Sequence, residues 1–397
     1  MTSLQPEDVR KLLQHMERDT LSLYLDTDPT KPENQRRPEA FRIWARHELK
    51  KLPESMARVL TPKEQKNLEA QSEMLLKELE LLKPQGRTFV FFSSPQWQLS
   101  AFYQARLHQN SLHFGAPHVA PLLWLMEEYA RAAIVLLDHQ QARFMTVHMG
   151  ITEGIQEEFL YLDTADYPEY SLRATPIPSG EGAVYKKGSF GDVFARRVEE
   201  QVHRFWRDAA QRLEKFIQEE DPVLVLLAGE DKARSFVRGR LSPAARERVL
   251  EEGVSFAVGA PEREILLKAK PLLQEGERQR EVRLVESLLQ EVAAKGKADA
   301  GAGAVLNQLR EGNVRLVAAA WPITREAIYV CQHCGAYFEE SHEVCPLCGG
   351  EMTRRSFATA LAREVHLKSA QLELVTGKAA ERLQQPPYGR VAAQLRF

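Results

Sequence analysis

Several classes of protein are excluded by what the sequence lacks. A membrane-spanning helix needs about 18 or more consecutive apolar residues, and apolar segments such as Ala132 to Leu137 have only the length of a buried strand. The chain is 44% hydrophobic and 27% charged, close to the average of globular proteins, which excludes a fibrous or disordered chain. Residues 1–7 do not begin a secretory signal, so we expect no membrane association and a cytoplasmic location.

A large excess of one charge is also missing. The chain of 397 residues has 53 Lys and Arg against 55 Asp and Glu, a net charge of -2. This excludes a protein that coats nucleic acid through bulk positive charge. Any RNA contact must therefore come from local clusters of Lys and Arg, which meet phosphate groups whatever the net charge.

Standard hydrolase motifs are absent as well, since neither Gly-x-Ser-x-Gly nor His-Glu-x-x-His occurs. Asp138, Asp163 and Asp192 could form a Mg²⁺ site, which would make the protein a metal-dependent RNA nuclease. Acidic residues at strand ends and helix starts ordinarily serve as turn and cap residues. The nuclease remains an alternative that requires at least two of these carboxylates to lie together.

Cysteine is rare, and all four cysteines fall in one short window. They form two Cys-x-x-Cys motifs ten residues apart, made by Cys331, Cys334, Cys345 and Cys348. Four thiolates complete the tetrahedron that Zn²⁺ favours and leave no open position for catalysis. The spacing therefore predicts a structural zinc ribbon at residues 331–350. A zinc-ribbon adaptor that binds only proteins is the second alternative.

The pattern of apolar residues predicts a mixed α/β, or α+β, chain of several domains. Strands are expected at 21–26, 89–93, 97–103, 132–137, 144–149, 223–227, 314–318, 371–375 and 391–397. Helices are expected between 39 and 82 with a break near Pro53, at 192–219, 261–294, 304–309 and 357–367, with short ones after 119 and after 375. The domain boundaries proposed are 1–118, 119–260 and 261–397.

The best loop candidate, Ser171 to Gly191, leads into a cationic helix start. Glycines there let the backbone approach a partner, and the cations can meet phosphates. The proposed RNA-binding residues are Lys186, Lys187, Gly188, Ser189, Arg196, Arg197 and Arg204. The ordinary alternative is a solvated helix face, which Glu199 and Glu200 would help to form.

Taken in order, these features resemble the archaeal and eukaryotic release-factor superfamily, in particular its bacterial members. The resemblance covers nearly the whole chain. It is carried by Leu21–Thr27, Ala132–Asp138, Phe144–Gly150, Val223–Gly229, Lys297–Gly301, Val305–Leu309, the position of the ribbon and the ending Tyr388–Phe397. It implies an N-terminal α/β domain with a helical hairpin, an RNase-H-like central domain and a C-terminal ribosomal-protein-like α/β sandwich with an inserted zinc ribbon.

One departure from the superfamily matters for function. Its release factors carry Gly-Gly-Gln in the central-domain loop, and alignment on Phe194-Ala195-Arg196 puts Lys187-Gly188-Ser189 at that place. Gly-Gly-Gln occurs nowhere in the chain. In this respect the sequence is similar to the Pelota-like and Balon-like members, which act on stalled or idle ribosomes. The resemblance therefore implies a non-enzymatic factor that binds rRNA in the ribosomal A site, in hibernation or rescue, with a translational GTPase or the ribosomal stalk as a further partner.

Overall fold

The computed structural model describes residues 12, 19–57, 60–107, 109–159, 190–255, 259–323 and 326–397, with only the backbone described at 190–197. The chain folds into two compact units, one made of Met1–Ala130, Met149–Ile151 and Glu277–Phe397 and the other of Arg131–His148 and Thr152–Gly276. Both contain helices and sheets, so the predicted mixed α/β class is confirmed. The three-domain boundaries remain a prediction. None of the described helices is long and apolar enough to span a membrane.

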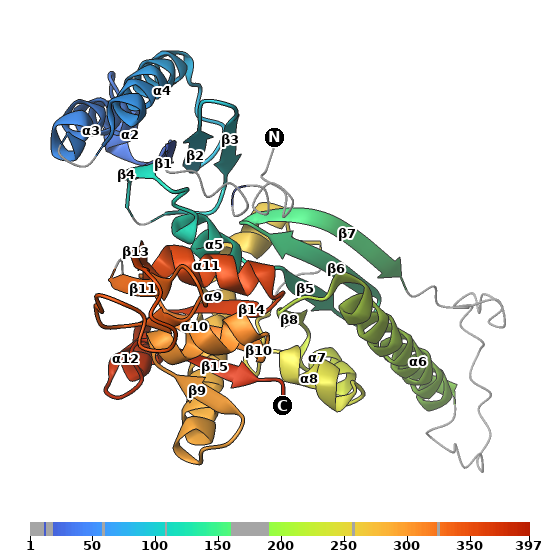
Figure 1. The fold of residues 1–397 in the computed structure, drawn as a ribbon. Coiled ribbons are helices and arrows are strands. Elements are labelled where there is room, and N and C mark those ends of the chain that lie inside the picture. Colours follow the sequence, from blue (N-terminus) through green and yellow to red (C-terminus); the bar gives the residue numbers. More distant parts are fainter. Residues whose placement is uncertain are drawn as a thin grey trace, which may run out of the picture. The chain divides into compact units, whose positions relative to one another are not determined.

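The N-terminal part of the first unit is an antiparallel sheet in the order β3-β2-β1-β4 (Figure 1). Its strands are β1 Thr20–Asp26, β2 Thr88–Ser93, β3 Gln98–Tyr103 and β4 Ser111–Gly115, and its helices are α2 Pro32–Gln35, α3 Ala40–Met56 and α4 Pro62–Leu81. Alternate residues of β1 point to one face, where Leu21, Leu23 and Leu25 pack in a buried cluster with apolar residues of α3 and α4. This packing holds the two helices on the sheet.

The end of α3 and the start of α4 are set by different residues. Thr61 accepts a hydrogen bond from the Glu64 N–H, and the Glu64 carboxylate accepts one from the Thr61 N–H, which makes a capping box at the start of α4. The break expected near Pro53 is wrong, because α3 continues through Pro53 to Met56. Since the helix ends within one turn, the missing N–H of Pro53 removes only one hydrogen bond near its end.

The C-terminal part of the first unit is a second sheet, in the order β14-β10-β15-β9, with β10 and β14 parallel and the other pairs antiparallel (Figure 1). Its elements are β9 Ala298–Ala300, α10 Ala302–Glu311, β10 Val314–Ala320, α11 Phe357–Leu367, β14 Gln371–Val375, α12 Gly377–Gln384 and β15 Val391–Leu395. Apolar residues of α10 and α11 cover one face, while α12 and residues 285–289 of the long helix α9 (Glu262–Ala293) cover the other. A sandwich of helix, sheet and helix results.

The cysteine segment is inserted into this sandwich between β10 and α11. It forms a small antiparallel sheet in the order β12-β11-β13, from β11 Ala327–Cys331, β12 Tyr337–Phe338 and β13 Met352–Ser356. The ribbon is therefore an excursion from the sandwich, as the sequence predicted.

The second unit is built on the sheet β7-β6-β5-β8, in which β5 pairs antiparallel with β6 and parallel with β8. Its elements are β5 Ala132–Leu137, β6 Gln141–His148, β7 Ile151–Phe159, α6 Phe190–Glu220, β8 Leu224–Gly229, α7 Asp231–Arg238, α8 Pro243–Arg248 and the first half of α9 Glu262–Ala293. Both faces of β5 are covered. Phe205, Leu213 and Phe216 of α6 pack on one face of the sheet, and Ile265 and Ala269 of α9 pack on the other.

Helix α6 begins at Phe190, two residues earlier than expected, so Gly191 is helical rather than part of the loop. A glycine near a helix start is tolerated because the first turn has few helical hydrogen bonds to lose. The rest of the predicted loop, residues 171–189, lies outside the described residues.

A cluster of charged residues in the first unit ties α9 to α5 Ala120–Glu128 and to the end of β14. Arg278 pairs with Glu281 at 3.0 Å and with Glu128, and Glu281 accepts a hydrogen bond from the Thr376 N–H at 3.1 Å. Burial of Glu281 raises its pKa from 4.5 to about 7, although Arg278 and the Thr376 N–H act in the opposite direction. This part of the fold therefore carries a carboxyl group that titrates near neutral pH.

Candidate metal centre and nucleic-acid interface

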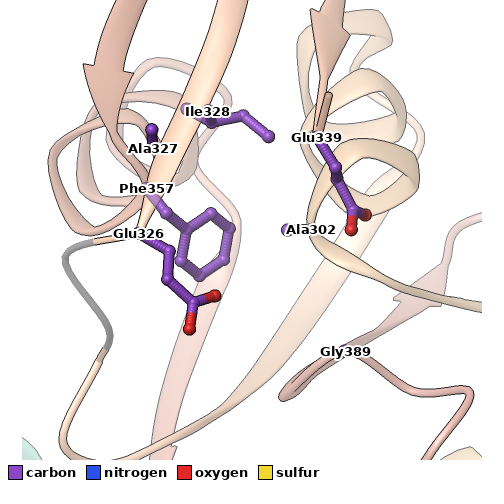
Figure 2. A pocket seen from close by; sticks show the side chains of 7 residues that line it. All are labelled: Ala302, Glu326, Ala327, Ile328, Glu339, Phe357 and Gly389. Atoms are coloured by element: carbon purple, nitrogen blue, oxygen red, sulfur yellow. The ribbon is translucent and has the colours of Figure 1, made fainter. Parts of the chain in front are cut away.

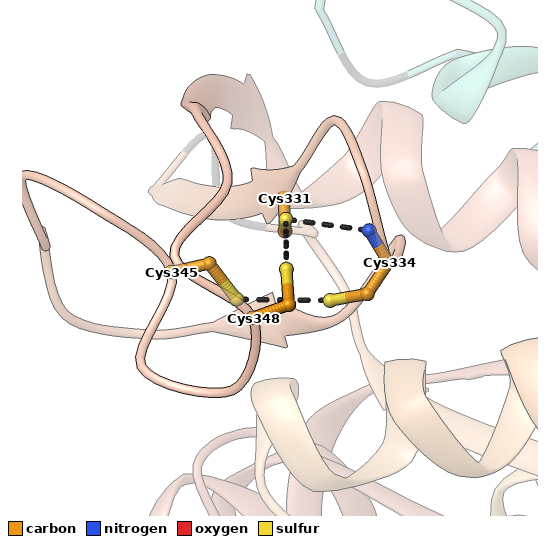
Figure 3. A group of neighbouring side chains, drawn as sticks. All are labelled: Cys331, Cys334, Cys345 and Cys348. Atoms are coloured by element: carbon orange, nitrogen blue, oxygen red, sulfur yellow. Dashed lines mark hydrogen bonds between the residues drawn. The ribbon is translucent and has the colours of Figure 1, made fainter.

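The four cysteine sulfurs converge in the ribbon (Figure 3). All four Sγ atoms lie within 4.8 Å of one another, with Cys331 and Cys348 at 3.5 Å and Cys334 and Cys345 at 3.6 Å. Tetrahedral zinc with bonds of about 2.3 Å places its sulfur ligands about 3.8 Å apart. The donor set and spacing therefore fit a closed structural Zn²⁺ site, as the sequence predicted.

Both Cys-x-x-Cys segments adopt the same turn. The N–H of Gly335 donates to the Cys331 carbonyl, and the N–H of Gly349 donates to the Cys345 carbonyl. The φ angles of these two glycines are +73° and +72°, in the left-handed region that side chains other than glycine rarely adopt. Each glycine thus lets the chain turn so that both cysteines of its pair face one point.

The space around the sulfurs is closely filled. A Cβ atom at Gly350 would lie 3.0 Å from the Cys331 sulfur and 2.8 Å from the Cβ of His333. The N–H groups of Cys334 and His333 also donate to the Cys331 sulfur, and they lower the pKa of Cys331 to about 6 despite its burial. The backbone therefore stabilises a thiolate, which is the form that binds metal.

A pocket of about 310 Å³ opens where the ribbon meets the sandwich, with Glu326 and Glu339 on opposite sides and Phe357 between them (Figure 2). Glu339 accepts a hydrogen bond from the Gly303 N–H at 2.8 Å, so its carboxylate lies at the start of α10, where a negative charge is stabilised. The remaining lining residues are Ala302, Ala327, Ile328 and Gly389. Among the described lining residues, the two carboxylates are the polar side chains.

Of the three carboxylates in the alternative Mg²⁺ site, the structure describes only Asp138. Asp138 accepts hydrogen bonds from the N–H groups of Gln140 and Gln141, both at 2.6 Å, and so acts as a turn residue. Asp163 and the side chain of Asp192 lie outside the described residues. Within the described part of the chain, the cysteine cluster is the one group of three or more suitable side chains close enough to hold a metal. No observation favours the nuclease.

The predicted RNA-binding residues are described only in part. Lys186, Lys187, Gly188 and Ser189 lie outside the described residues, and Arg196 and Arg197 are placed on α6 by their backbone alone. Arg204 is exposed on α6. The assignment of these residues to RNA stays a prediction.

Another set of cations was missed by the sequence reasoning. Between residues 231 and 248, on α7 and α8, the chain carries six Lys and Arg against two acidic residues. This local excess in a chain of net charge -2 was the signal that could have directed attention to the segment.

Comparison with known proteins finds a matching family and a similar curated relative. Residues 117–274 match the family described as Bacterial archaeo-eukaryotic release factor family 10. Over 301 residues the chain is 25% identical to Peptide chain release factor subunit 1 of Archaeoglobus fulgidus, covering 70% of this chain and 69% of the relative. These two matches support membership of the archaeal and eukaryotic release-factor superfamily. The resemblance drawn from the sequence is confirmed at that level.

Solved structures from the superfamily are similar at low identity. The archaeal translation termination factor aRF1 is 14% identical, with 99% of both chains covered and a TM-score of 0.27. Archaeal Pelota, from a model of ribosome-bound Pelota and ABCE1, is 16% identical, with 78% of each chain covered and a TM-score of 0.41. Both TM-scores are under 0.5, so the support for the superfamily comes from the two sequence matches.

Proposed function

We propose that this protein is a ribosome-binding translation factor that occupies the A site of idle or stalled ribosomes and does not hydrolyse peptidyl-tRNA. The observation that carries the proposal is the match to a release factor over most of both chains, combined with the absence of Gly-Gly-Gln from the sequence. Membership of the superfamily supports binding to the ribosome, while the missing Gln removes the residue by which release factors position water. Binding to the ribosome without hydrolysis of peptidyl-tRNA is consistent with both observations.

In this role, the segment around Lys186 and Lys187 and the start of α6 contact rRNA phosphates near the peptidyl-transferase centre. The N-terminal sheet with α3 and α4 faces the decoding centre. The proposal treats the zinc ribbon as a structural element of the C-terminal sandwich, because four cysteine ligands leave no position for a substrate. In this proposal, the C-terminal sandwich is the part that binds a translational GTPase or the ribosomal stalk.

Sedimentation of cell lysates tests the proposal and separates its two forms. Lysates from growing cells, from starved cells and from cells with ribosomes stalled on truncated mRNA are separated on sucrose gradients, and the protein is detected in each fraction. Co-sedimentation with 70S particles only in starvation indicates hibernation, whereas enrichment on stalled complexes indicates rescue. Recovery at the top of the gradient in all three conditions would contradict the proposal.

A variant of the loop and helix start tests the proposed RNA contact. Replacing Lys186, Lys187, Arg196 and Arg197 with Ala should weaken binding to 70S ribosomes and flatten its salt dependence by roughly one unit of slope per lost phosphate contact. A solvated helix face predicts no change in either quantity. Affinities measured at several salt concentrations therefore distinguish the two interpretations.

A further inference from the structure

Helix α7 and the turn after it carry a row of cations around an aromatic ring. Lys232, Phe236 and Arg240 are spaced four residues apart, which aligns them along one side of the helix and its extension. Ala233 and Val237 are buried against the sheet, while Lys232 and Arg240 are exposed. The cations therefore face solvent while the neighbouring residues hold the helix in place.

Helix α6 continues this surface. The ring of His203 stacks on Phe236, with centroids 5.2 Å apart and 7° between the planes, and Arg207 follows one helical turn later. Trp206 also contacts Phe236, at 5.5 Å, and its indole N–H donates to the Asp138 carbonyl at 2.7 Å. The aromatic groups thus fix α6 and α7 to each other and to the sheet.

The guanidinium of Arg240 lies over the Phe236 ring, with Cζ 4.2 Å from the centroid. A cation–π contact of this kind holds the charged group without neutralising it. Because its position is already restricted, less conformational entropy is lost when it binds an anion. We call Arg207, Lys232 and Arg240, with the rings of His203 and Phe236, the basic stripe.

The cations of the stripe differ from others in the same unit. Arg131, Arg143, Arg212, Arg234 and Arg248 each have a carboxylate oxygen within 4.0 Å. Among the described residues, no carboxylate is paired with the three cations of the stripe. Paired cations are already partly neutralised, whereas the three cations of the stripe, on α6, α7 and the turn after α7, have no carboxylate partner in the described part of the chain.

We propose that the basic stripe is a second RNA-binding surface of the central unit, which takes the phosphodiester backbone of structured RNA. This inference rests on the proposed function, and it extends the rRNA contact to residues outside the predicted loop. Phosphates along an RNA strand repeat at short intervals, and a row of separated cations suits such a repeating anion. Exposed Arg and Lys contact the phosphates, while the stacked rings set the spacing of α6 and α7.

A charge-neutralising variant tests the stripe in the full-length protein. We expect Arg207→Gln/Lys232→Gln/Arg240→Gln to keep the wild-type circular dichroism and melting temperature, since exposed unpaired cations contribute little to stability. The matched control is Lys215→Gln/Arg248→Gln/Lys268→Gln, which removes the same charge from paired cations of the same unit. Both variants are measured against vacant 70S ribosomes and a short fluorescein-labelled RNA duplex.

The expected result is a loss of affinity of roughly 10- to 100-fold at 0.1 M salt for the stripe variant, with the slope of log affinity against log salt reduced by about 2 to 3 units for three lost phosphate contacts. The control should change both quantities far less. The wild type could bind ribosomes while the stripe variant keeps the wild-type affinity and salt dependence for both probes. In that case the basic stripe does not bind RNA, and the proposed function is unaffected.

The wild type could bind the RNA duplex but not ribosomes. If the stripe variant then loses binding to the duplex, the proposed function is wrong, while RNA binding by the basic stripe is supported. If the wild type binds neither RNA, both proposals fail. An affinity loss of equal size in the control variant would also contradict RNA binding by the basic stripe. It would show that affinity depends on the net charge of the protein rather than on Arg207, Lys232 and Arg240.

Discussion

Replacement of Glu281 by Gln should change how the stability of the first unit depends on pH. Glu281 is buried on α9 beside Arg278, and its pKa is raised from 4.5 to about 7. The fold therefore favours the protonated carboxyl group. As the pH rises above 4.5, the unfolded chain releases this proton first, so the free energy of unfolding falls between pH 4.5 and 7 and levels off above that range.

The pKa difference sets the size of the effect. A pKa raised from 4.5 to about 7 corresponds to about 3 kcal/mol if the surroundings do not relax. Water penetration and movement of the Arg278 side chain reduce this energy. We therefore expect the free energy of unfolding to change by on the order of 1 to 3 kcal/mol. For a unit of this size, that is a decrease of roughly 3 to 8 °C in melting temperature between pH 4.5 and 7.5.

Thermal unfolding at a series of pH values measures this decrease in melting temperature. The amide introduced by Glu281→Gln can still accept the hydrogen bond from the Thr376 N–H but does not ionise, so the variant should lose much of the decrease seen in the wild type. Glu127 should leave a residual decrease, because burial and the nearby Glu373 also raise its pKa. The control is Glu381→Gln, on an exposed side chain of α12. An equal pH dependence in wild type and Glu281→Gln would show that Glu281 does not cause the decrease in stability.

Three further predictions concern the ribbon and the loop. Cys345→Ser should release zinc and unfold residues near 331–350 while the flanking sandwich survives, because a closed tetrathiolate site couples metal binding to local folding; metal analysis and hydrogen exchange measure both. Gly350→Ala should weaken zinc retention against a chelator, since the added methyl group would meet the Cys331 sulfur at 3.0 Å, and wild-type retention would contradict the described packing. Purified wild type should release no peptide from programmed ribosomes, and a release rate abolished by Ser189→Ala would mean that the protein hydrolyses peptidyl-tRNA through a changed motif.

Much of the fold could be predicted where local pattern and tertiary packing agree. β5 is a continuous apolar run because both of its faces are covered, and α6 repeats apolar residues at helical spacing because one side packs on the sheet. The cysteine spacing predicted the ribbon for a similar reason. A tetrahedral ion constrains sequence and structure together, so two short motifs were enough to place the site.

Other elements were missed because their cause is not local. β7 Ile151–Phe159 is mostly polar and exposed, and as an edge strand it pairs through its backbone without an apolar face. β4 is only five residues long and is stabilised by its pairing with β1. Charge pairing is also a tertiary property, and the sequence alone could not separate Arg234, which is paired with Asp231, from Arg240, which lies over Phe236.

Competition with A-site tRNA shows whether the protein occupies the ribosomal A site. Fluorescently labelled protein is bound to vacant 70S ribosomes, and tRNA with its cognate mRNA codon in the A site is titrated against it. Binding in the A site requires mutual exclusion, so we expect stoichiometric displacement of the protein as tRNA fills the A site. Simultaneous binding of protein and A-site tRNA to the same ribosomes would contradict it.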